Sequence, residues 1–582
     1  MYFNCTVKIP DVKGKIITKI KGDSSYVLYQ YDSVYNKQKK YAVPKRCIIG
    51  KVSKDDPTSM FPNEKFETYF PDVVIPEALP FAYRSSCLKV GSYLVIQKII
   101  EDYNLMDMLK KRFGDDTGLI LDLIAYLIID EENVGQYYPD FAFEHPLFSK
   151  KMKIYSDSKI SNLFKELTQN QFLSFLDDWN KDRDHDSRIY VSYDSTNKNS
   201  EAGDIDLLEF GKAKDDKGYP IFNISIAMDK TNKIPLFYEE YPGSIVDVSQ
   251  FEFMVDKVIE YGYKQVGFIL DRGYFSKENI QYMDDNGYSF IIMCKGCKEL
   301  VSSLVLQKMG TFETKRESSI RAYKRYGTTV KTKLYDDDKE ERYFHIYFNP
   351  VKLSAEREQL EIKIDSLRKF LDKHIGSKTK FGKPYHDYFN LEYSDEGVLI
   401  SVEENTEVIE RELKLCGYFC IITSEEMSAA QALIHYKGRD ISEKLFRDDK
   451  TFIGSKSERV QSSESMSSKI FIEFVALIVR NRMYNLLKEK MIENGTKQNF
   501  MTVPASIRQL EKIQMTRRNG GKYKLDYAIT KTQKIILSAF GLDENDVFKK
   551  ARDIGNYLAN CQSLMDKEEE QEEEIIEDEV DI

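Results

Sequence analysis

The chain has 582 residues, 42% of them hydrophobic and 13% aromatic, so it is long enough for several domains and apolar enough to form a core. Its formal charge of −10 is unevenly spread: residues 566–582 hold 11 acidic residues and one lysine, which leaves 84 basic and 84 acidic residues elsewhere. A neutral body excludes nucleic-acid binding driven by net charge, so a basic surface must come from local clustering.

The cysteines and the N-terminus bear on the cellular compartment. Eight cysteines without regular spacing predict free thiols in a reducing environment. The first residues, MYFNCTVKIP, lack a signal-peptide pattern, and no run reaches the roughly 18 apolar residues that span a bilayer. We therefore expect a cytoplasmic protein with no membrane segment.

The N-terminal third divides into two modules. Residues 1–85 alternate short β-type runs with Gly, Pro and Asp, which predicts a small strand-rich module. Residues 86–185 change to helical periodicity and predict a helical module that could bind the ends of a DNA element. Within it, residues 156–167 fit either a base-reading helix or a plain amphipathic helix that packs its apolar face inward.

The middle of the chain predicts an α/β domain. Residues 186–299 have the order strand, strand, strand, helix, strand, helix, strand, which indicates a mixed sheet covered by helices and is the ribonuclease-H-like order. Residues 300–412 interrupt this pattern with strands and a charged helix, so we interpret them as an insertion subdomain. The catalytic domain is expected to resume over 413–490, followed by a helical region at 491–565 and an acidic disordered tail at 566–582.

Two aspartates end apolar strands of this domain. Asp194 follows RIYVSY, and Asp271 follows VGFIL. Open α/β sheets bind ligands at the carboxyl ends of their strands, and neighbouring carboxylates there attract hard divalent cations. Either aspartate alone is better explained as a turn former, whereas the two together make a metal site equally plausible.

A third acidic residue lies in the segment YKGRDISEKLFRDDK. On a helix that advances about 100° per residue, Tyr436, Arg439, Glu443 and Lys450 fall on one stripe. Glu443 could complete a metal cluster, while Arg439 and Lys450 could hold phosphates. Taken alone, Arg439 and Glu443 also fit an ordinary surface ion pair at i and i+4.

These segments together resemble a known family. The spacing Tyr, two residues, Arg, three residues, Glu, six residues, Lys is the signature of the DDE insertion-sequence transposases of the insertion-sequence-four superfamily, and the chain is most similar to the sixteen-thirty-four branch. Blocks of the family also occur in the correct order: YDST, FGKAKDDKGYP, IPLFYEEYPGSIVD, DRGYFSKEN and GYFCIITSEE. The resemblance covers about residues 185–485.

The resemblance implies a function and a set of site residues. Asp194, Asp271 and Glu443 would be catalytic metal ligands, and Tyr436, Arg439, Lys450 and Arg272 would contact DNA. The family implies a ribonuclease-H-like endonuclease that cuts and joins double-stranded DNA, at element ends and target, with two Mg²⁺ ions, for which Mn²⁺ can substitute. It also implies a homodimer on DNA and a prokaryotic, nucleoid-associated location.

Two rival interpretations remain open at this point. One is a ribonuclease-H-like nuclease that hydrolyses DNA without strand transfer. The other is a catalytically inactive descendant that only binds DNA. The three acidic residues at the expected positions favour the active enzyme.

Overall fold

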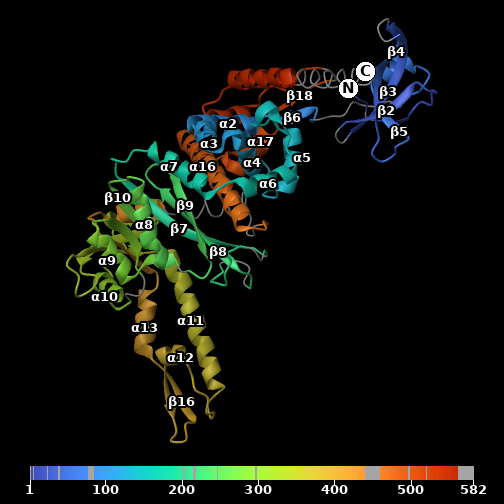
Figure 1. The fold of residues 1–582 in the computed structure, drawn as a ribbon. Helices are drawn as coiled ribbons and strands as arrows, with labels where there is room; N and C mark the ends of the chain where they lie inside the picture. Colours follow the sequence, from blue (N-terminus) through green and yellow to red (C-terminus); the bar gives the residue numbers. More distant parts are fainter. Residues whose placement is uncertain are drawn as a thin grey trace. The chain divides into compact units, whose positions relative to one another are not determined.

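The structure is a computed structural model that divides into two units, residues 1–163 with 482–582 and residues 164–481 (Figure 1). It describes residues 2–3, 5–21, 24–36, 40–75, 84–200, 202, 205–213, 218–245, 247–294, 298–438, 459–495, 498–518 and 521–561. Each unit is described by itself.

A five-stranded antiparallel sheet forms the N-terminal part of the first unit. Its strands are β1 (Val7–Lys8), β2 (Ile16–Lys21), β3 (Ser24–Asn36), β4 (Tyr41–Val52) and β5 (Ser59–Pro62), in the spatial order β1-β5-β4-β3-β2. Helix α1 (Glu64–Tyr69) packs Phe66 against Val27, Ile49 and Met60 on one face of the sheet. Asn63 caps this helix by accepting a hydrogen bond from the Phe66 amide at 3.2 Å.

Helices dominate the rest of the first unit. They are α2 (Gly91–Asp102), α3 (Leu105–Phe113), α4 (Thr117–Ile129), α5 (Tyr138–Glu144), α6 (Asp157–Glu166, which runs into the second unit), α17 (Val503–Leu510) and α18 (Lys531–Ala539). Helix α4 is buried almost all round because its sequence TGLILDLIAYLII is apolar on every face. Helix α6 buries Ile160 and Leu163, as the amphipathic interpretation requires.

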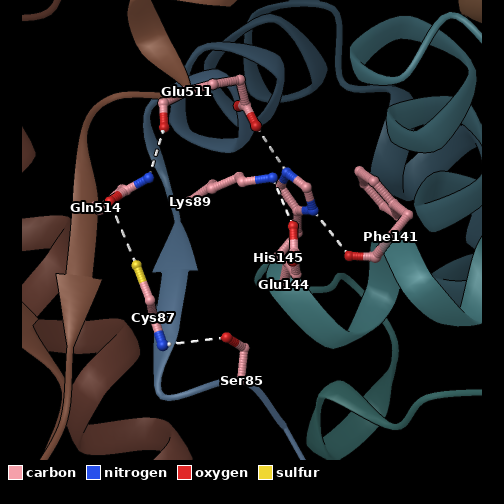
Figure 2. A network of polar contacts seen from close by, with 8 residues as sticks. All are labelled: Ser85, Cys87, Lys89, Phe141, Glu144, His145, Glu511 and Gln514. Carbon is pink, nitrogen blue, oxygen red and sulfur yellow. Dashed lines mark hydrogen bonds and ion pairs between the residues drawn. The ribbon is translucent and has the colours of Figure 1, made fainter.

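Segments far apart in the sequence meet in this unit. Strand β18 (Gln514–Thr516) pairs with β6 (Cys87–Lys89) on one side and β19 (Lys524–Leu525) on the other. Figure 2 shows the polar contacts beside this small sheet: Lys89 lies against Glu144, and the buried ring of His145 lies 2.8 Å from both the Phe141 carbonyl and the Glu511 carboxylate. These contacts tie β6 to the end of α5 and to the segment between α17 and β18.

A nine-stranded mixed sheet is the centre of the second unit. Its order is β12-β13-β14-β17-β11-β10-β7-β8-β9. The strands are β7 (Ile189–Asn199), β8 (Ile221–Asp229), β9 (Ile234–Pro242), β10 (Val266–Leu270), β11 (Ser289–Met293), β12 (Ser319–Ile320), β13 (Arg325–Thr332), β14 (Arg342–Phe348) and β17 (Tyr418–Thr423).

The connections of this sheet follow the order predicted from the sequence. Strand β8 runs antiparallel to its neighbours β7 and β9, and β10 and β11 are parallel to β7. Helix α8 (Phe251–Glu260) joins β9 to β10, and α9 (Lys277–Asp285) joins β10 to β11. The prediction of a mixed sheet with helices is confirmed.

The sequence predicted one insertion subdomain over residues 300–412, but part of this region belongs to the main sheet. Strands β13 and β14 extend the main sheet, because β14 pairs along its length with β17. A distinct core forms only further on, where α11 (Pro350–Asp372), α12 (Lys383–Tyr388), β15 (Phe389–Tyr393), β16 (Leu399–Glu404) and α13 (Thr406–Leu415) pack around Leu371, Phe389 and Leu399. The aromatic and β-branched residues of RYFHIYF suit a strand buried in a larger sheet.

The described residues contain no helix that combines the length and the apolar character needed to traverse a bilayer.

Candidate active site

The fold brings Asp194 and Asp271 side by side. Strands β7 and β10 are hydrogen-bonded parallel neighbours, with Tyr193 opposite Leu270. Asp194 and Asp271 are the next residues on the two strands, which lie about 4.8 Å apart. Strand β10 ends at Leu270, whereas β7 continues to Asn199 beside β8. The two carboxylates therefore share the carboxyl edge of the parallel part of the sheet.

Backbone contacts orient both carboxylates while leaving them half-buried. Asp194 Oδ1 accepts a hydrogen bond from the Ser195 amide at 3.0 Å, and Asp271 Oδ1 accepts one from the Arg272 amide at 2.7 Å. Because each acidic side chain is held by the residue that follows it, its position is set locally once the strands have paired. The exposed side chain of Arg272 lies at this same edge.

Tyr436 lies next to this pair, in a position different from the open face expected from the sequence. It is on α14 (Ala429–Gly438), only 4% exposed, and packs with Ile269 and Leu433 beneath the sheet edge. Its hydroxyl group donates to Asp271 Oδ1 at 3.5 Å. The ring is therefore part of the core, and its hydroxyl group points at the carboxylate.

The remaining predicted site residues are Arg439, Glu443 and Lys450, and all three lie outside the described residues. Helix α14 is described up to Gly438, directly before Arg439. Within the described part of the chain, no three His, Cys, Asp or Glu side chains are grouped closely enough to hold a metal ion. The described site thus consists of two carboxylates with Tyr436 and Arg272 beside them.

A buried ion pair near the site was missed at the level of sequence. Lys198 on β7 and Glu473 on α16 (Ser463–Glu493) form a contact of 2.7 Å between Nζ and Oε2, with side chains 0% and 2% exposed. Lys198 lies four residues beyond Asp194, so it projects from the same face of the strand. The pair fixes the Asp194 strand to the helix that follows the signature segment. Its sequence signal is a lone acidic residue in the apolar run IFIEFVALIV.

The donors of the described site fit a divalent metal ion. Two adjacent carboxylates supply hard oxygen ligands, and their partial exposure gives an ion a route of entry. Two negative charges at this spacing repel each other unless a cation or a proton neutralises them. Asp194 and Asp271 are therefore the described residues suited to hold such an ion.

Comparison with known proteins agrees with this geometry. The parallel strand pair with two carboxylates at one edge shows that this part of the chain is an α/β domain with a candidate cation site. The sequence comparison narrows the class of protein further: residues 193–479 match the family model described as "Transposase DDE domain". Residues 193–479 are therefore similar to a transposase DDE domain, a kind of domain that acts in DNA transposition and generally uses divalent metal ions.

Other comparisons add less. No curated protein sequence matches the chain. One solved structure similar to the chain is a cryo-EM structure of piggyBac transposase in a synaptic complex with hairpin DNA. The identity is 8%, the TM-score is 0.33, and the alignment covers 72% of this chain and 77% of the other.

Proposed function

We propose that this protein binds the ends of its own insertion sequence, hydrolyses phosphodiesters there and joins the 3′ ends to target DNA. The catalytic domain is ribonuclease-H-like, and the chain belongs to the sixteen-thirty-four branch of the insertion-sequence-four superfamily. The observation that carries the proposal is the register of β7 and β10, which sets Asp194 beside Asp271 within the matched DDE domain.

In this proposal Asp194, Asp271 and Glu443 hold two Mg²⁺ ions. When bound, divalent ions stabilise the charge that develops on the phosphodiester and lower the pKa of the attacking water. The hydroxyl group of Tyr436 helps to orient Asp271 through the contact at its Oδ1. The same centre serves hydrolysis and then attack by the released 3′ hydroxyl group on target DNA.

The proposed DNA contacts come from the signature segment and from the sheet edge. Arg439 grips a phosphate with its planar guanidinium group, and Lys450 contributes a point charge. Arg272, which is exposed and directly follows Asp271, lies where it can position a strand at the metal ligands. A homodimer assembled on two element ends would let each end meet a complete site.

The decisive experiment compares hydrolysis and strand transfer. Duplexes that carry the inverted repeats flanking the coding region serve as cleavage substrates, and pre-cut versions serve as donors for joining to a plasmid. With Mg²⁺ or Mn²⁺, the wild-type protein should perform both reactions. Glu443→Gln should lower both rates by at least about a thousandfold, the scale of removing a catalytic group, while binding of the duplex is retained.

Each contrary outcome has a definite meaning. Cleavage without joining of pre-cut ends would assign the chain as a nuclease. Binding without cleavage by the wild-type protein would make it an inactive descendant. Unchanged rates in Glu443→Gln would remove the third ligand.

A further inference from the structure

The hairpin of β3 and β4 extends beyond the sheet that contains it. Strand β2 pairs with β3 only over Ser24–Tyr29, and β5 pairs with β4 only over Gly50–Val52. Residues 30–36 and 41–46 still pair with each other, and in the described part of the chain no third strand joins them. This stretch, together with Lys40 directly before β4, is here called the ribbon and spans roughly 20 Å along each strand. Figure 1 shows the two strands within the blue sheet.

The ribbon exposes large apolar and aromatic side chains, and their exposure to water does not stabilise a two-stranded element. Tyr35 is 62% exposed, Tyr41 51% and Val34 48%, whereas Tyr31, at 42%, stacks on Tyr69 of α1. Isolated two-stranded hairpins are only marginally stable in water, so a ribbon rich in exposed aromatic residues indicates a surface that is covered by a partner.

The charge of the ribbon indicates the kind of partner. The described residues of 30–46 include three basic residues, Lys40, Lys45 and Arg46, and one acidic residue, Asp32. Residues 1–75 carry 13 basic and eight acidic residues, whereas the chain without its acidic tail is neutral. Lys40 and Lys45 are exposed. Lysines and tyrosines together suit a phosphate backbone, because ammonium groups neutralise phosphates and phenol hydroxyl groups donate to them.

The register distributes these groups over both faces. Strand pairing places Asp32 opposite Lys45 and Val34 opposite Val43, so Asp32, Val34, Tyr41 and Lys45 share one face. Tyr35 and Arg46 lie on the other face by the same alternation. A ribbon with polar and basic groups on both faces can lie between the two phosphate walls of a groove. The major groove of B-DNA, about 12 Å wide, admits a two-stranded ribbon.

The edges of the ribbon argue against a partner that adds another strand. Pro44 has no amide hydrogen to donate, and the exposed Lys45 follows it, which are features that block pairing at a sheet edge. A second copy of this chain or a peptide strand is therefore disfavoured relative to a partner that meets the faces of the ribbon.

We propose that the β3–β4 ribbon docks into the groove of duplex DNA and anchors this protein to its substrate through residues other than those of the carboxylate site. The inference rests on the proposed function in one respect, namely that the substrate is DNA. It assigns a role to a module that the family resemblance leaves without one.

The test measures the affinity of the full chain for a labelled duplex of mixed sequence by fluorescence anisotropy, without divalent metal, over a range of salt concentrations. The variant Lys40→Ala/Lys45→Ala/Arg46→Ala removes three ribbon cations. It should weaken binding by at least about tenfold and lower the salt slope by about 2 to 3, because each phosphate contact contributes about 0.9 to the slope. Tyr35→Ala/Tyr41→Ala should weaken binding with little change in slope.

The matched control removes the same charge from the same module. Lys8, Lys54 and Lys65 are exposed and lie outside the ribbon. The triple alanine variant at these positions should bind as the wild type does. Circular dichroism and thermal unfolding of every variant exclude misfolding as the cause of a loss.

Three results would overturn the inference: an unchanged affinity and slope in the ribbon variants, an equal loss in the control, or a change of oligomeric state with DNA binding intact. A stronger effect on single-stranded than on duplex DNA would also overturn groove docking. Because binding is measured without metal, a failure of the ribbon is separable from a failure of catalysis. Wild-type cleavage with unaltered binding by the ribbon variants would leave the transposase assignment standing.

Discussion

Carboxylates in the two units of this protein show two different uses of an aspartate in an apolar environment. Asp122, on α4 of the first unit, is fully buried and accepts hydrogen bonds from the amides of Phe148 and Ser149 at 2.5 and 3.2 Å and from the Tyr138 hydroxyl group at 3.4 Å. In the second unit, Asp194 and Asp271 are half-buried at a sheet edge.

The difference teaches how to distinguish a structural carboxylate from a ligand. Burial raises the pKa of Asp122 to about 7, although its hydrogen bonds act in the opposite direction. Its backbone donors, Phe148 and Ser149, follow α5 and its third donor, Tyr138, is on α5, so Asp122 holds this helix and the segment after it in place. At the sheet edge, access and a second carboxylate matter more than complete burial, because a hard cation needs both.

The largest expected effect is the loss of cleavage when a carboxylate at the sheet edge is changed. Asp194→Asn should lower metal-dependent cleavage by at least about a thousandfold and leave DNA affinity unchanged, because it removes a ligand and keeps the side-chain volume. Single-turnover cleavage and anisotropy measure the two quantities. Asp122→Asn is the matched control and should cleave within a few-fold of the wild type below its unfolding temperature. Robust cleavage by Asp194→Asn would show that this carboxylate is not a ligand.

A second prediction concerns a buried charge that has a partner of opposite sign. Lys198→Met leaves the Glu473 carboxylate buried without its ammonium partner, which should destabilise the fold by about 3 to 5 kcal/mol. The double variant Lys198→Met/Glu473→Leu should recover most of the loss, because it removes both charges of the pair. Chemical unfolding of the wild type, of the single variants Lys198→Met and Glu473→Leu and of the double variant gives the coupling between the sites. Equal instability of the single and double variants would show that packing, not charge, was lost.

The smallest effect is the pH dependence that Asp122 contributes to stability. Its pKa is about 7 in the folded protein, against a usual 3.8, so the folded state holds the proton more tightly than the unfolded state does. The contribution is fully present below about pH 4 and falls by about 1.4 kcal/mol per pH unit until it is lost near pH 7.

Unfolding of the wild type and of Asp122→Asn at pH 5 and pH 7 measures this term. Between pH 5 and pH 7, the free energy of unfolding of the wild type should fall by roughly 2 to 3 kcal/mol more than that of the variant. An identical pH dependence in both proteins would mean that Asp122 ionises as an exposed aspartate does.

Much of the α/β domain could be predicted from the sequence, because the patterns that indicate its strands and helices are local. Alternating strand and helix patterns predicted the order from β7 to β11, and each aspartate follows an unbroken apolar run that ends in a turn. The Tyr436 stripe was predicted from helical spacing alone, which specifies a shared face and not what covers it. The ring of Tyr436 is in fact buried against Ile269 and Leu433.

Other features depend on pairings that no local pattern encodes. Strand β6 pairs with β18 more than 400 residues away, through Cys87 and Thr516. Strand β14 joins the main sheet although it begins at Arg342, far along the chain from the end of β11 at Met293. A short apolar run fits any sheet with a vacant edge, so only the tertiary packing decides which one it joins.

The sequence by itself determined which side chains could perform metal chemistry and which segments would become the strands that present them, since residue type and periodicity are properties of the chain. The tertiary structure decided that β7 and β10 are neighbours in a register that aligns Asp194 with Asp271. It also paired Lys198 with Glu473 and left the β3–β4 ribbon without further strands. These outcomes follow from burying apolar surface with every strand partnered where possible, a condition on the whole molecule that no single segment contains.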